Sequence, residues 1–163
     1  MSEMRIEIRA QTDVAKITLH GVPDEPGIAG EVFSCLGQAG HTVELVVSAG
    51  AGKGRADISL VVRESELETV LASLGKIRHK VGARDVAHDR GVALVSAVGS
   101  GLAGTPGVAG RMFRTLSAVG INIDLISTSI ASVTCVIPRG AAEKGMEALR
   151  REFGLASSAS PAP

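Results

Sequence analysis

The spacing of apolar residues alternates along the chain between the period of a strand and the period of a helix. Apolar and charged residues alternate over residues 4–9, which predicts a half-buried strand, and a second strand follows over residues 14–21. Helical spacing begins at Ile28 and runs to about residue 39, where Gly40 provides a C-terminal cap. The next predicted elements are a strand, a flexible hairpin loop, a strand, a helix and a short strand: residues 42–48, 49–55, 56–62, 65–76 and 80–87.

The second half of the chain repeats this order. At an offset of 80 positions, Pro26 aligns with Pro106 and Gly27 with Gly107, and the register continues through Phe33 and Phe113. The second repeat is expected to contain a strand, a helix, two strands and a helix: residues 92–99, 108–119, 122–127, 133–137 and 141–153. The pattern therefore predicts an α+β protein of two ferredoxin-like β-α-β-β-α-β units, each with both helices on one face of an antiparallel sheet.

The second repeat lacks a fourth strand of its own. After residue 155 the chain continues into Ala, Ser and Pro residues, and the composition of residues 156–163 predicts a disordered tail. An open sheet edge would favour aggregation, and the N-terminal strand has no other partner. We therefore predict that residues 4–10 complete the second sheet, so that the first domain (residues 14–88) is inserted into the second (residues 4–10 and 91–155).

Composition narrows the possible functions. Seventeen basic residues balance seventeen acidic ones, and Trp and Tyr are absent, which argues against a nucleic-acid surface. Cys35 and Cys135 lie in apolar runs and are expected to be buried free thiols in a reducing compartment. The four histidines have no metal-ligand spacing and are expected at the solvated surface. We expect a cytoplasmic protein with no catalytic site, metal or cofactor, since no signal peptide, membrane span or catalytic grouping is visible.

Two stretches of the chain resemble a known family. Residues 21–27 (Gly-Val-Pro-Asp-Glu-Pro-Gly) and residues 120–129 (Gly-Ile-Asn-Ile-Asp-Leu-Ile-Ser-Thr-Ser) are similar to the paired ACT domains of the aspartate kinase regulatory region. The similarity extends from about Asp13 to Leu155. It implies feedback inhibition by an end-product amino acid (threonine or lysine), a homodimer formed through the ACT domains, and an aspartate kinase catalytic chain as partner. A kinase portion is not expected here, because the Lys-Phe-Gly-Gly start and the room for a nucleotide-binding domain are missing.

The family resemblance places an effector pocket where the two repeats meet. An amino acid carries a carboxylate, which suits the unpaired N–H groups of the helix start after Gly27, and an ammonium group, which suits Asp24. From the other repeat, Asn122 would supply an amide and Ile123 an apolar wall. The expected ligand-binding residues are Asp24, Pro26, Gly27, Ile28, Ala29, Ser48, Asn122 and Ile123.

Pseudo-symmetry implies a second, weaker pocket. It would be formed by two short groups of residues: Thr105, Gly107, Val108 and Ala109 opposite Thr42 and Val43. Here the loop is two residues longer, and Gly104 stands where Asp24 stands in the first repeat. Two departures from the family pattern leave the effector and the role open: Ser48 replaces a common glutamine, and Ile130-Ala131-Ser132 replaces a Glu-Ile-Arg run.

The same residues also fit other interpretations. Judged alone, the acidic loop before Gly27 is an ordinary turn at a helix start, and Asn122 is equally consistent with a strand-start residue that bonds its own loop. A free-standing tandem ACT module with a different partner is the alternative function. A small enzyme that uses the cleft between the domains has little support, because only Asp24 among reactive side chains lies near the expected pocket.

Overall fold

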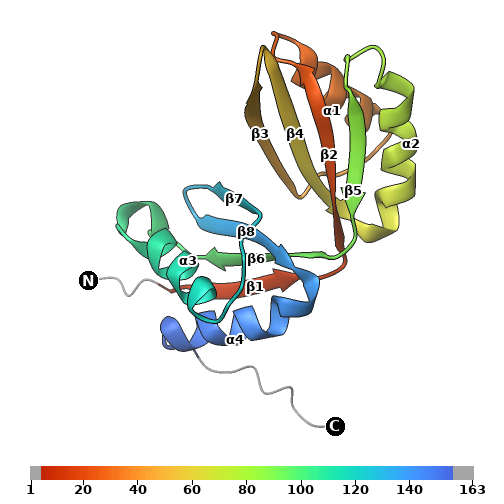
Figure 1. Cartoon of the computed structure of the whole chain (residues 1–163). Coiled ribbons are helices and arrows are strands. Elements are labelled where there is room, and N and C mark those ends of the chain that lie inside the picture. Colours follow the sequence, from red (N-terminus) through yellow and green to blue (C-terminus); the bar gives the residue numbers. More distant parts are fainter. Residues whose placement is uncertain (1–4, 156–163) are drawn as a thin grey trace. The chain divides into compact units, whose positions relative to one another are not determined.

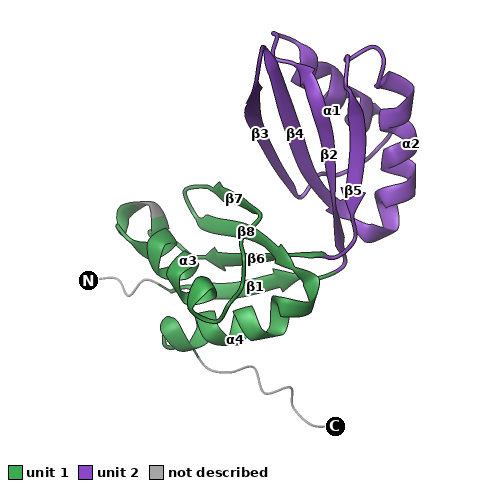
Figure 2. Ribbon diagram, viewed as in Figure 1, with its two compact units in different colours: residues 1–12, 92–163 green, residues 13–91 purple. Residues whose placement is uncertain are grey.

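The computed structural model describes residues 5–155, which form two compact units (Figures 1 and 2). Unit 1 comprises residues 1–12 and 92–163, and unit 2 comprises residues 13–91. Unit 2 corresponds to the first repeat, and unit 1 corresponds to the second repeat together with the N-terminal strand. Met4 and the predicted tail over residues 156–163 lie outside the described residues. Within residues 5–155, no helix has the length and apolar character needed to span a bilayer.

Unit 2 is a four-stranded antiparallel sheet covered by two helices on one face. The chain order is β2 (Val14–Pro23), α1 (Ile28–Gln38), β3 (Leu45–Gly52), β4 (Arg55–Arg63), η1 (Glu64–Glu66), α2 (Leu67–Ile77) and β5 (Asp85–Asp89). The strand order across the sheet is β3-β4-β2-β5. Alternate residues of β2 and β4 pack against the apolar stripes of both helices, which places α1 and α2 on the same face: Ala15, Ile17, Leu19, Ile58, Leu60, Val62, Val32, Leu36, Leu67, Val70 and Leu74.

Unit 1 has the same architecture but takes one strand from the beginning of the chain. Its elements are β1 (Glu7–Gln11), β6 (Val92–Val98), η2 (Leu102–Gly104), α3 (Val108–Ala118), β7 (Leu125–Thr128), β8 (Ser132–Pro138), η3 (Arg139–Ala141) and α4 (Ala142–Glu152). The sheet order is β1-β6-β8-β7, and β1 pairs antiparallel with β6. The N-terminal strand therefore lies in the sheet of the second repeat, and the predicted fold class, with one unit inserted into the other, is confirmed.

The segment predicted as a flexible loop over residues 49–55 is instead part of a β-hairpin, with one irregularity between Gly50 and Gly52. β3 extends to Gly52, and a two-residue turn at Lys53 and Gly54 leads into β4. Both turn residues have positive φ angles, 55° and 70°. This is the backbone geometry of a type I′ turn, whose twist matches that of the flanking strands. The glycines that suggested flexibility lie in an edge strand, where packing demands on side chains are lowest.

Three predicted strands begin later than expected. The chain after α2 continues in turns through Gly82, which has a φ of 66° and packs against Pro23, so that β5 begins only at Asp85. The segments before β3 and β7 are irregular up to Leu45 and Leu125. In both places a backbone hydrogen bond to the neighbouring strand forms just before β3 or β7 begins. Pairing with that neighbouring strand therefore decides where β3 and β7 begin.

The cysteines and histidines only partly follow expectation. Cys135 is fully buried and Cys35 is half-buried, and both thiols are free. The side chain of His41 is only 9% exposed. Its ring lies 3.5 Å from a carboxylate oxygen of Glu66 and 3.4 Å from the Ser73 hydroxyl, so the expectation of a solvated histidine was wrong here. Residues 5–155 contain no group of three or more His, Cys, Asp or Glu side chains placed to hold a metal ion.

Candidate ligand-binding site

The helix-start loop of unit 2, residues 22–29, turns the chain from β2 into α1. The backbone N–H of Asp24 donates a 2.9 Å hydrogen bond to the carbonyl oxygen of Gly54, which ties the loop to the β3–β4 turn. Gly27 adopts φ 95° and ψ −18°, in the left-handed region that favours glycine. A β-carbon at Gly27 would meet no heavy atom within 4 Å, so the backbone angle, and not crowding, requires glycine. The loop is open to solvent at five positions: Asp24, Glu25, Pro26, Gly27 and Ala29.

The start of α1 offers backbone donors to a ligand. The first helical hydrogen bond runs from the N–H of Glu31 to the carbonyl of Gly27, at 3.0 Å. Gly27 has no side chain with which to cap the helix, and no side-chain cap hydrogen bond is present. The N–H groups of the first turn therefore have no acceptor within the helix, and they carry the positive end of its dipole. A carboxylate suits this position, and the Asp24 side chain upstream supplies the opposite charge for an ammonium group.

Arg55, at the start of β4, holds the base of the helix-start loop. Its guanidinium donates hydrogen bonds to the carbonyl oxygens of Gly21 and Gly82, at 3.0 and 3.1 Å. Gly21 lies in an irregularity of β2, between Leu19 and Val22. One side chain thus links two segments that are distant in sequence. These contacts help to set the direction in which the chain leaves β2 and enters the helix-start loop.

Asp57 supports the same bend from the next outward-facing position of β4. One carboxylate oxygen accepts a 2.8 Å hydrogen bond from the N–H of Gly21, and the other lies 3.4 Å from the His20 ring. The Gly21 N–H lowers the pKa of Asp57, with a smaller contribution from His20 and an opposing effect of burial. A β-carbon at Gly21 would lie 2.8 Å from the Arg84 side chain, so this position also requires glycine. Arg55 and Asp57 are site residues that the sequence patterns did not identify.

The two strand-start segments occupy equivalent places in their own units. Asn122 is exposed and Ile123 packs partly against the core of unit 1, while Thr42 is exposed and Val43 packs partly against the core of unit 2. The N–H of Glu44 bonds Val61 at 2.8 Å, and the N–H of Asp124 bonds Val136 at 2.9 Å. Asn122 and Thr42 lie before the strands, and the expectation that they begin them was wrong. Among the described residues, none hydrogen-bonds the side-chain amide of Asn122.

Within one unit, the helix start and the strand start lie at opposite ends of a helix. α1 and α3 each have eleven residues, which corresponds to a length of about 16 Å at 1.5 Å per residue. A free amino acid is much shorter than that. A helix-start loop and the strand-start segment of its own unit therefore lie too far apart to contact one free amino acid together.

The helix-start loop of unit 1 is built differently. It carries the additional turn η2, and the Thr105 hydroxyl donates a 3.0 Å hydrogen bond to the carbonyl of Gly101. Gly107 starts α3 with φ 87° and ψ −4°, nearly the geometry of Gly27. Val108 is buried and Ala109 packs partly against the core. The loop shares the left-handed glycine and the free first turn, but its hydroxyl is used internally and it has no acidic residue in place of Asp24.

Ser48 lies in the middle of the edge strand β3 and is exposed. It pairs with Ile58, a core residue, so its side chain lies on the helix-covered side of the sheet. β3 runs from Ser48 toward the turn that bonds Asp24. The geometry places Ser48 on the same side of the sheet as α1.

Known proteins are similar to this chain in sequence. The family model described as ACT domain matches residues 17–76 and 95–153. An aspartate kinase of Stutzerimonas stutzeri is 36% identical over 143 residues, and an aspartokinase of Thermus thermophilus is 33% identical over 145 residues; each match covers 88% of this chain. The chain spans only 35% and 36% of the lengths of these two relatives.

Solved structures give the same result over nearly the whole chain. The ligand-free regulatory subunit of aspartate kinase from Thermus thermophilus has a TM-score of 0.84 and 32% identity, and the match covers 90% of this chain and 96% of that one. A structure described as aspartokinase alpha and beta subunits has a TM-score of 0.84 and 33% identity, with 91% and 97% covered.

Two units, each with a four-stranded antiparallel sheet and two helices, the first of which starts at a glycine, define the chain as a tandem of small regulatory-type domains. It belongs to the ACT domain family. Within that family the chain corresponds to the regulatory ACT part of aspartate kinases, which are phosphotransferases.

Proposed function

We propose that the chain binds an end-product amino acid, with threonine as the first candidate, and thereby inhibits an aspartate kinase catalytic chain. The observation that supports this most is the open helix-start loop of unit 2. It combines the N–H groups of Ala29 and Gly30 in the first turn of α1, which have no acceptor within the helix, with the exposed carboxylate of Asp24. A free amino acid is a small molecule with both complementary charges. The small polar side chain of threonine suits a site whose other expected members are Ser48, Asn122 and Ile123.

The proposed ligand also contacts a strand-start segment, namely Asn122 and Ile123. Within one unit, about 16 Å of helix separates the helix-start loop from the strand-start segment, which supports a site that takes residues from both repeats. In this proposal Asn122 contributes its amide, and Ile123 covers the apolar part of the ligand. The weaker second site would combine Thr105, Gly107, Val108 and Ala109 with Thr42 and Val43 in the same way.

We further propose a homodimer formed through the ACT sheets. The edge strands β3 and β7 each carry an exposed apolar residue at the equivalent position, Val46 (43% exposed) and Ile126 (46% exposed). A second copy of the chain that paired with such an edge would cover these residues and satisfy the edge hydrogen-bonding groups. Light scattering with and without threonine tests this assembly.

Binding is tested by isothermal titration calorimetry with threonine, lysine and the other proteinogenic amino acids. Bound ligand also stabilises the fold, which gives a second measurement. At a ligand concentration 100-fold above its Kd, the free energy of unfolding rises by about 2.7 kcal/mol. Asp24→Asn is expected to weaken threonine binding by roughly 10- to 100-fold, since a charge-assisted hydrogen bond contributes about 1.5–3 kcal/mol. The matched control is Glu25→Gln, which removes an equal charge from the neighbouring exposed position and is expected to leave the affinity within about twofold.

Two results would overturn parts of this proposal. Equal losses in Asp24→Asn and Glu25→Gln would mean that only the general charge of the loop matters, and not a contact of Asp24. Threonine or lysine binding without any effect on an aspartate kinase catalytic chain, in a reconstituted activity assay, would favour a free-standing ACT module with another partner.

A further inference from the structure

A second candidate site lies in unit 1, away from the helix-start loops. α3 and α4 pack side by side over the sheet and leave between them a cavity of about 510 Å³. We call it the arginine groove, and its lining residues are Arg111, Arg114, Thr115, Ala118, Val119, Ala148, Arg151 and Glu152. Small and uncharged side chains from both helices line part of it, and three arginines and one glutamate supply its charges.

Arg111 is held in a fixed orientation at one side of the arginine groove. Its Nε donates to the Glu152 carboxylate and one terminal nitrogen donates to the Glu152 carbonyl, both at 3.1 Å. The guanidinium also lies 4.6 Å from the centre of the Phe153 ring. Two of its five N–H donors are used by these contacts, so the others remain for a ligand. A guanidinium that is already ordered loses less conformational freedom when it binds an anion.

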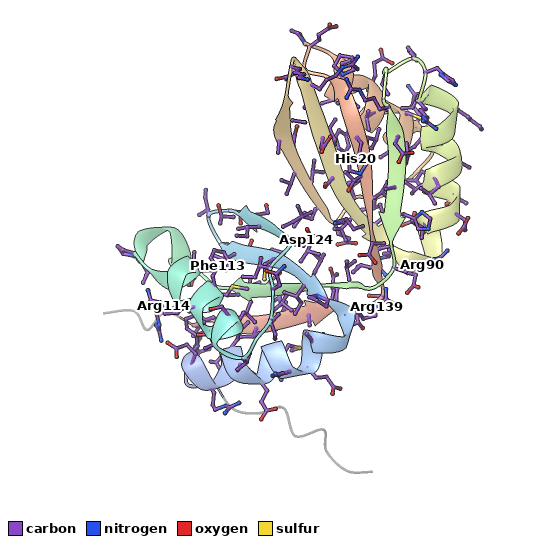
Figure 3. All side chains as sticks on the ribbon, in the orientation of Figure 1. His20, Arg90, Phe113, Arg114, Asp124 and Arg139 are labelled. Carbon is purple, nitrogen blue, oxygen red and sulfur yellow. The ribbon has the colours of Figure 1, made fainter. Side chains whose placement is uncertain are left out.

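The other two arginines are less constrained. Arg114 is exposed on α3 (Figure 3), and no described residue forms an ion pair or hydrogen bond with its guanidinium. Arg151 has one loose contact with Glu147, at 3.8 Å, in which both side chains are more than 70% exposed. Such a surface pair is worth little and is easily exchanged for a stronger acceptor. Two guanidinium groups are therefore available beside the ordered one.

The equivalent groove in unit 2 shows that the fold does not require this charge. Matching α1 to α3 and α2 to α4 aligns the three arginines with Glu31, Ser34 and Lys76. The Glu31 carboxylate accepts a 2.6 Å hydrogen bond from the Lys80 ammonium group. The same helix pair is thus built without an arginine cluster in unit 2, although packing against the sheet is the same. Arg111 contacts Glu152 and Phe153, but packing does not explain the exposed Arg114 and Arg151 beside it.

We propose that the arginine groove binds a small molecule with two or more negative charges on phosphate or carboxylate groups. The planar guanidinium forms two parallel hydrogen bonds with either group, and several of them favour a multiply charged anion. A volume of about 510 Å³ is larger than a single phosphate needs and lies in the range of metabolite-sized ligands. This site shares no residue with the proposed amino-acid site, and the two proposals stand or fall separately.

The test is isothermal titration calorimetry of the whole chain with inorganic pyrophosphate and with citrate, at low and at moderate salt. These two probes distinguish a phosphate ligand from a carboxylate ligand. We expect one of them to bind with a stoichiometry of one, and Arg114→Ser to weaken that binding about tenfold. Arg114→Ser introduces the residue found at this position in the first repeat and is expected to leave thermal unfolding unchanged, because the side chain is exposed. The matched control, Lys76→Ser, removes one positive charge from the equivalent groove of unit 2 and is expected to leave the affinity unchanged.

Several outcomes would overturn the proposal. Failure of both anions to bind at low salt would do so, as would equal weakening by Arg114→Ser and Lys76→Ser, which would indicate non-specific attraction. An unchanged affinity in Arg114→Ser would exclude the groove as the place of binding. If a hexaglutamate peptide bound in an Arg114-dependent way and neither small anion did, the groove would be assigned to an acidic polypeptide instead.

Discussion

Ile8 allows a direct test of how the two units are interleaved. It is only 4% exposed and belongs to the core of unit 1, although only a few residues separate it from β2 of unit 2. Its strand β1 pairs with β6 over five residue pairs, from Glu7 with Val98 to Gln11 with Leu94. Replacing Ile8 with alanine leaves a cavity in this core, and such substitutions cost about 2–4 kcal/mol. That is a large part of the 5–15 kcal/mol that stabilises a typical domain.

The assay is native-state hydrogen exchange measured by mass spectrometry. A loss of about 2–4 kcal/mol in unit 1 speeds exchange of the protected amides of β6 and β8 by roughly 30- to 700-fold, since each 1.4 kcal/mol is a factor of ten. The amides of β2 and β4 in unit 2 are expected to keep their rates. Removing residues 1–11 extends the same test, because it deletes the whole β1 ladder and leaves β6 as a sheet edge.

Arg9→Ala is the control for Ile8→Ala. Arg9 lies in the same strand, and its ion pair with Glu7 has both side chains at least 60% exposed, so its loss is expected to leave the stability of unit 1 nearly unchanged. Equal acceleration of exchange in β2 and β6 after Ile8→Ala would refute the reasoning, because the N-terminal strand would then stabilise both sheets alike.

Two further predictions concern titratable groups. The carboxylate of Asp57 has a pKa below the ordinary value for aspartate, chiefly because the Gly21 N–H bonds its charged form. It therefore stabilises the fold above about pH 4, and this contribution is lost as the pH falls through the lowered pKa of the folded state. The difference in free energy of unfolding between wild type and Asp57→Asn, about 1 kcal/mol because the side chain is 38% exposed, should be constant between pH 5 and 8 and shrink below pH 4 in urea titrations; a constant difference down to pH 2 would contradict this assignment. Burial raises the pKa of the Cys135 thiol to about 12, so at pH 8 only about one molecule in ten thousand carries the reactive thiolate. Iodoacetamide should therefore modify Cys135 only after unfolding, as peptide mass spectrometry will show, and rapid modification of the native protein would mean that β8 opens readily.

Features that repeat with a fixed period were predictable from the sequence. Val32 and Leu36 of α1, and Met112 and Leu116 of α3, are spaced for one face of a helix, and all four are buried. The place of β1 followed from counting strands, because the second repeat had one too few. These predictions depend only on the spacing of apolar residues, which is a local property of the sequence.

Features that depend on residues distant in sequence were not predictable in this way. The bend that Arg55 and Asp57 support involves Gly21, which is 34 and 36 positions away. The predicted strand over residues 56–62 left Arg55 in the hairpin loop, and its apolar pattern gave no sign of the β2 irregularity that brings Gly21 within reach. The starts of β3 and β7 were misplaced for a related reason: a backbone hydrogen bond to the neighbouring strand decides them, and not a change in periodicity.

The two repeats separate what the fold requires from what it leaves free. Both keep a left-handed glycine before the first helix, at Gly27 and Gly107, because the chain must turn from a strand into a helix there. A β-carbon at either glycine would meet no heavy atom within 4 Å, so the positive φ angle, and not crowding, favours glycine at both positions. One loop could thus carry Asp24 and the other the extra turn η2, and the groove between two helices could acquire arginines in unit 1 without disturbing the core. The arginine groove is lined by residues of unit 1 alone, whereas the proposed amino-acid site takes residues from both repeats, so the two sites must be tested with separate probes.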